Sequence, residues 1–122
     1  MPHFPTRLLG LGGSAGFSGA VCGQASNTLT ATGANQGAAL ALTTEINNVT
    51  TVAASTGVRL PPGEMGAFVV VRNGGANALL VYPATGGAIN ALATNAGYSV
   101  AAGSTALLFG VTDTLWVALA AA

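Results

Sequence analysis

The sequence from Met65 to Tyr82 reads MGAFVVVRNGGANALLVY, two short apolar runs separated by Asn-Gly-Gly. β-Branched and aromatic residues dominate the first run, which favours a β-strand over a helix. Asn-Gly and Gly-Gly are typical turn residues, and the sequence PATGG at residues 83–87 ends the second run in the same way. The stretch therefore predicts strands joined by tight turns, as in β-hairpins.

The same alternation of apolar runs and turn residues continues on both sides of this stretch. Strand-length runs follow at residues 88–92, 97–100, 105–109 and 114–119, with turns at 103–104 and 112–113. Earlier runs occur at residues 28–32, 38–44, 46–52 and 58–60. Many short strands at this spacing are typical of sandwiches and barrels. We expect an all-β fold, a compact antiparallel β-sandwich of jelly-roll type with little or no helix.

The first part of the chain has a different composition. Pro2 and Pro5 disfavour a helix, and a glycine-rich segment follows them. Arg7 and the leucines after it resemble the start of a secretory signal, but glycines interrupt the apolar segment that a signal requires. We therefore expect an extended N-terminal arm over residues 1–26 and a β-sandwich body over residues 27–122. The side chains of the arm expected to contact a partner are His3, Phe4, Arg7, Leu8, Leu9, Leu11 and Phe17.

Charge is unusually scarce in this chain of 122 residues. Only 5% of the residues are charged, against about 25% in ordinary soluble domains, and the formal net charge is zero. A neutral surface resists association poorly, so we expect self-association, as a homotrimer. Three dispersed arginines, balanced by three acids, do not form the basic surface of a nucleic-acid-binding protein. Apolar runs are also too short for a membrane-spanning helix.

Residues for catalysis are few. His3 is the only histidine and Cys22 the only cysteine, so neither a metal-ligand cluster nor a nucleophile–base pair is evident. The only acids, Glu45, Glu64 and Asp113, are far apart in sequence, and they would form a glycosidase pair only by converging in space. The sequence predicts a non-enzymatic protein with no cofactor, no metal and no small-molecule substrate.

One segment carries a family resemblance. The sequence from Val58 to Asn90, with VYPATGGAIN at residues 81–90, resembles a module of tailed-bacteriophage structural proteins. Residues 101–106 and the strand around Trp116 continue the resemblance. It implies a β-rich virion component, often trimeric, that decorates a capsid or forms part of a fibre or spike. The resemblance supplies no catalytic motif.

Two functions are consistent with these features. In the first, the protein is a capsid decoration or cement protein on the virion surface, whose arm clamps neighbouring subunits of the major capsid protein. The alternative is a head-fibre, tail-fibre or spike module that binds a host receptor or glycan, with Tyr82, Tyr98 and Trp116 stacking on sugar rings. Each of these three residues lies within an apolar strand, so we expect them in the core or in an interface.

Overall fold

The apolar runs form strands in the computed structural model of the chain, which describes residues 23–121. The larger sheet contains six strands in the spatial order β1 (Ala25–Thr30), β3 (Ile46–Thr51), β5 (Phe68–Asn73), β9 (Thr105–Gly110), β10 (Leu115–Ala121) and β7 (Ala88–Ile89). The smaller sheet contains β2 (Leu40–Ala41), β4 (Gly57–Arg59), β6 (Leu79–Tyr82) and β8 (Tyr98–Val100). A single 3₁₀ turn, η1 (Gln36–Ala38), is the only helical element of the described residues. The all-β prediction is confirmed.

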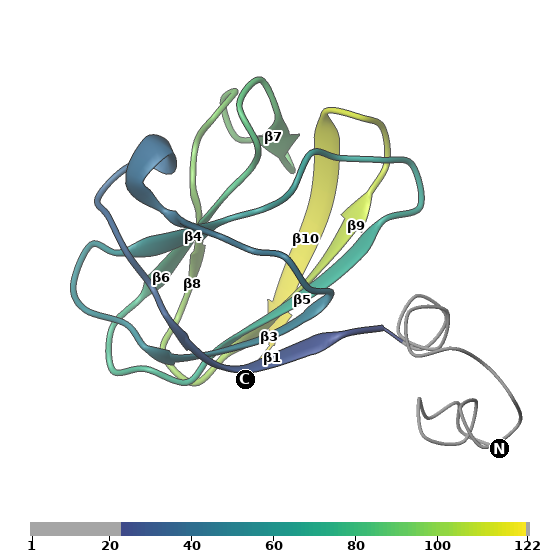
Figure 1. Cartoon of the computed structure of the whole chain (residues 1–122). Helices are drawn as coiled ribbons and strands as arrows, with labels where there is room; N and C mark the ends of the chain where they lie inside the picture. The colour runs from purple at the N-terminus through teal and green to yellow at the C-terminus, as the bar shows by residue number, and fades with distance from the viewer. Residues whose placement is uncertain (1–22, 122) are drawn as a thin grey trace, which may run out of the picture.

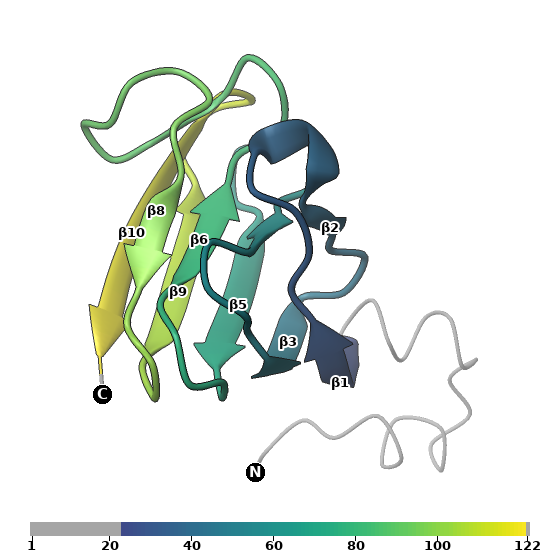
Figure 2. The same cartoon turned by 90° about the vertical axis from the view of Figure 1, so that its left-hand side faces the viewer.

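The first six strands wind between the two sheets (Figures 1 and 2). Odd-numbered strands β1, β3 and β5 lie side by side and parallel in the larger sheet. Even-numbered strands β2, β4 and β6 do the same in the smaller sheet. Each odd–even pair is thus one coil, and the three coils stack as in a β-solenoid.

The prediction of antiparallel sheets in a jelly roll is wrong for most of the fold. Among the strands of residues 23–121, antiparallel pairing joins β6 to β8, β5 to β9, and β9 to β10, and so always involves a strand that follows the third coil. The turn at Asn73-Gly74-Gly75 does not close a hairpin, because the chain leaves it for the other sheet. By contrast, the predicted turn at residues 112–113 does join two antiparallel neighbours, β9 and β10.

The hydrophobic core lies between the two sheets. Alternate residues of β5 and β9 point inward, so that Val69, Val71, Ala106 and Leu108 are buried. Trp116 of β10 is the largest fully buried side chain, with 1% of its surface exposed. The core is completed chiefly by Val49, Val58, Leu60, Leu79, Val81, Ile89 and Val100.

Two buried asparagines brace the places where the chain changes sheets. Asn47 donates to the backbone oxygens of Thr44 and Val70, and its Oδ1 accepts from the Thr44 hydroxyl at 2.9 Å. Asn73 donates to the oxygens of Asn77 and Val100 at 2.8 and 2.9 Å, and accepts from the Gly75 N–H. Buried amides are tolerated because they are hydrogen-bonded in this way.

The described body begins before the predicted boundary at residue 27. Strand β1 starts at Ala25, which pairs with Ile46 of β3. Residues 1–22, which include most of the predicted arm, lie outside the described residues.

Candidate functional site

The partner-contacting residues predicted in the arm cannot be placed by this structure. His3, Phe4, Arg7, Leu8, Leu9, Leu11 and Phe17 all lie outside residues 23–121. Cys22 is also outside that range. The arm therefore remains a sequence-based prediction, and the site is sought in the body.

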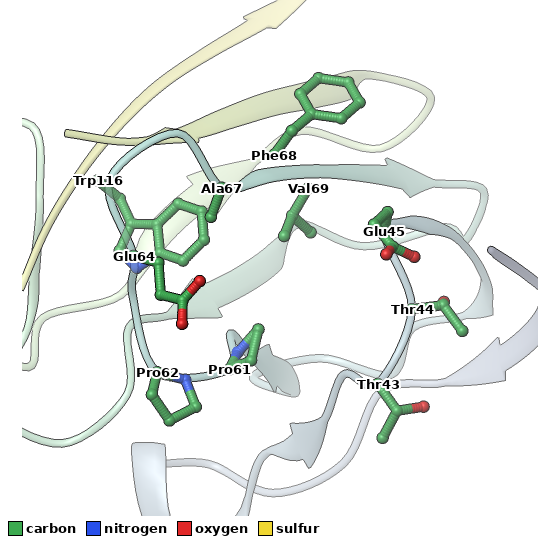
Figure 3. A pocket seen from close by; sticks show the side chains of 10 residues that line it. All are labelled: Thr43, Thr44, Glu45, Pro61, Pro62, Glu64, Ala67, Phe68, Val69 and Trp116. Carbon is green, nitrogen blue, oxygen red and sulfur yellow. The ribbon is translucent and has the colours of Figure 1, made fainter. Parts of the chain in front are cut away.

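One pocket of about 280 Å³ opens between the coils (Figure 3). It is lined by Thr43, Thr44, Glu45, Pro61, Pro62, Glu64, Ala67, Phe68, Val69 and Trp116. The segment before β3 and the segment before β5 supply most of this lining. Its volume is below the range of roughly 300–1,000 Å³ that is usual for small-molecule sites.

The three acids do not gather in this pocket. Glu45 and Glu64 lie on opposite sides of it, and Asp113 is not among its lining residues (Figure 3). Oε2 of Glu45 accepts a hydrogen bond from the backbone N–H of Gln24 at 3.0 Å, which ties this carboxylate to the start of β1. A glycosidase pair needs two carboxylates that flank one scissile bond. Two of the three acids, Glu45 and Glu64, thus stand across the pocket from each other, and the Glu45 carboxylate is already engaged by the Gln24 N–H.

Metal and membrane features are also missing from the described part of the chain. Between residues 23 and 121, no three His, Cys, Asp or Glu side chains come together as ligands for a metal ion. No helix of that part has the length and apolar character needed to cross a membrane.

The three aromatic residues considered for glycan stacking are packed into the protein. Trp116 and Tyr82 are buried, and half-buried Tyr98 packs against the core cluster. The sequence predicts that these rings lie in the core or in an interface, and the structure places them in or against the core. A stacking platform needs ring faces open to a ligand, and buried Trp116 and Tyr82 do not supply one.

The most distinctive surface is the side of the larger sheet that faces away from the smaller sheet. The strand registers align Ile46, Val70, Leu107 and Leu119 in one row across β3, β5, β9 and β10. A second row aligns Phe68, Phe109 and Val117. We call these seven residues the outer face. Residues opposite one another in neighbouring strands project from the same side of a sheet, so the two rows form one continuous surface.

Most of the outer face is open to solvent. Ile46, Phe68, Phe109, Val117 and Leu119 are 41–53% exposed, and Val70 and Leu107 are half-buried. The rings of Phe68 and Phe109 are tilted by 40° with their centroids 5.3 Å apart, a usual geometry for an aromatic pair. Single exposed apolar residues are common on protein surfaces, whereas a contiguous group of them is a candidate interaction site.

A polar row borders the outer face. Asn48, Arg72 and Thr105 occupy the next register position, with Ala121 at its end. Nη1 of Arg72 donates to Oδ1 of Asn48 at 2.9 Å. An apolar centre with a polar margin is the usual anatomy of a protein–protein interface.

Sequence reasoning did not single out the residues of the outer face. Phe68 to Val71 is an unbroken apolar run, so the period of two that separates an inner from an outer face is hidden. The charge count was the available signal, because six charged residues cannot cover the surface of the chain.

Comparison with protein-family models, with curated proteins and with solved structures finds no match to this chain. The resemblance to phage structural modules therefore rests on the sequence alone.

Proposed function

We propose that the protein is a non-enzymatic structural component of a virus particle, acting as a capsid decoration or cement protein. It sits on the capsid surface and stabilises contacts between shell subunits. The observation that carries the proposal is the outer face, a contiguous apolar surface on a rigid all-β body.

Three features support this assignment. Charged surface residues keep a free protein dispersed in water. A protein bound to a particle surface is already held against protein neighbours, so it needs fewer of these charges. The two-sheet body holds the outer face on hydrogen-bonded strands, which position an interface more precisely than loops do. The resemblance of residues 58–90 to phage structural modules supplies the virion context.

The alternative function, a fibre or spike module that binds a glycan, has less support. It relied on Tyr82, Tyr98 and Trp116, whose side chains belong to or pack against the core. The exposed rings of the described body are those of Phe68 and Phe109, which pair with each other within the outer face.

Retention on particles tests the proposal. Particles purified from a lysate that contains the chain are stripped of it and then mixed with full-length protein or with a variant that lacks residues 2–20. We expect the full chain to sediment with the particles, and we expect the shortened chain to stay in solution because it lacks the predicted grip. Circular dichroism should show the same β-sheet spectrum for both, since the deleted residues precede β1.

The two contrary outcomes have different meanings. A full chain that does not bind the stripped particles contradicts the decoration function. A shortened chain that binds as tightly as the full chain contradicts the grip by the arm and makes the body the attachment site.

A further inference from the structure

We propose that the outer face is covered by the same face of a second copy of this chain, in a two-fold symmetric pair. This inference deepens the proposed function by naming a partner for the outer face. It predicts a solution property of the purified chain, so it can fail while the decoration function stands.

Two copies of the outer face are chemically compatible with each other. All seven residues are apolar, and none of them carries an ionisable group. Arg72 is the charged residue of the bordering row, and it is already hydrogen-bonded to Asn48. Covering this surface with an identical one therefore removes apolar area from water without burying an unpaired charge. A charged partner surface would lose its own hydration and find no complementary charge among the seven residues.

The geometry also suits an identical partner. The two rows span four neighbouring strands, with the Phe68–Phe109 ring pair on the middle strands β5 and β9. Twisted sheets pack face to face about 10 Å apart, with their strands rotated by roughly 30°. A two-fold axis through the ring pair brings the rings of one copy against those of the other. Such an interface is self-complementary and closed, and it leaves no free face for further growth.

The size of the outer face suits a weak pair. Its four strands lie about 4.8 Å apart and are each about 20 Å long, which gives a face of about 400 Å². Two such faces cover about 800 Å² in total, which is below the roughly 1,200 Å² of stable interfaces and in the range of weak, transient ones. We therefore expect a reversible pair rather than an obligate one.

The proposed pair differs from the homotrimer that the sequence analysis predicts. Low charge indicates that copies associate, but it carries no information on symmetry. An apolar face on one side of a sheet can be covered by one partner, whereas three such faces around an axis meet only along their edges.

Sedimentation equilibrium of the full-length chain, from about 1 to about 100 µM, tests the pairing. We expect the average mass to rise from that of one chain to that of two. The variant Leu119→Lys places an ammonium group in the interface of each copy, and we expect it to raise the dissociation constant at least about 100-fold. Leu92→Lys is the matched control, because Leu92 is 41% exposed but lies between β7 and β8, outside the larger sheet. It should pair like the unmodified chain.

A second variant guards against misfolding. Val117→Thr keeps the side-chain shape and a high strand propensity, and we expect it to weaken the pair about 5-fold with an unchanged circular dichroism spectrum. Pairing is overturned if the unmodified chain stays a monomer or forms a trimer, or if Leu119→Lys associates as tightly as Leu92→Lys. A monomer that is still retained on particles would overturn the pair alone, whereas a stable pair that particles do not retain would overturn the decoration function alone.

Discussion

Asn73 shows how single polar side chains hold the coils of this protein together. Its amide, fully buried, links the oxygens of Asn77 and Val100 to the N–H of Gly75. Asn77 in turn donates to the oxygen of Val52 at 2.8 Å, which connects the third coil to the second. These side chains replace the backbone pairing that strands lose where they end.

Replacing Asn73 by alanine should lower the free energy of unfolding by about 3 kcal/mol. Two carbonyl oxygens and one N–H would lose their partner in a buried environment, and each unsatisfied group costs about 1–3 kcal/mol before relaxation. Urea denaturation followed by the fluorescence of Trp116, the only tryptophan, measures the change. Asn27→Ala removes an exposed amide that accepts a 3.3 Å bond from Asn48, and should change stability by less than about 0.5 kcal/mol. Equal effects of the two substitutions would contradict the bracing role.

At the scale of elements, strands were predictable from the sequence and their partners were not. Apolar runs bounded by Gly, Asn and Pro indicated each strand within a few residues, because local propensity sets where a strand lies. Pairing depends on where the chain goes after each turn. Asn73-Gly74-Gly75 fits a hairpin turn by composition, but here the chain crosses to the other sheet, and the buried side chain of Asn73 braces that corner. The outer face was hidden for a related reason, since Phe68 to Val71 is apolar on both sides of the strand.

A substitution at Gly75 tests how closely the second and third coils approach each other. A Cβ at this position would lie 2.6 Å from Cβ of Val52, which the neighbouring coil holds against the core. We expect Gly75→Ala to lower the free energy of unfolding by about 1–3 kcal/mol, the usual cost of overpacking. Gly37→Ala is the control, because a Cβ there would meet only Oδ1 of Asn35, at 3.5 Å. A melting temperature for Gly75→Ala no lower than that of Gly37→Ala would contradict the close approach.

At the scale of the whole molecule, the scarcity of charge and the open apolar face both indicate a surface that is poorly suited to remaining in water. The chain cannot surround its body with ionised groups, and it gathers large apolar side chains on one side of the larger sheet. That side is available for contact because the smaller sheet covers only the opposite side (Figure 2). A free monomer would hold this face in water at a cost of roughly 25 cal/mol for each Å² of apolar area. Assembly removes that cost.

A reconstruction by electron cryomicroscopy of intact particles that contain the chain tests the central claim most directly. The proposed function predicts density for the two-sheet body on the outside of the shell, repeated with the shell's symmetry, with the outer face buried in a protein contact. Phe109 and Leu119 should lie inside that contact, and Leu92 need not. Density only at the tip of a fibre, or a shell-bound body whose outer face is open to solvent, would contradict it.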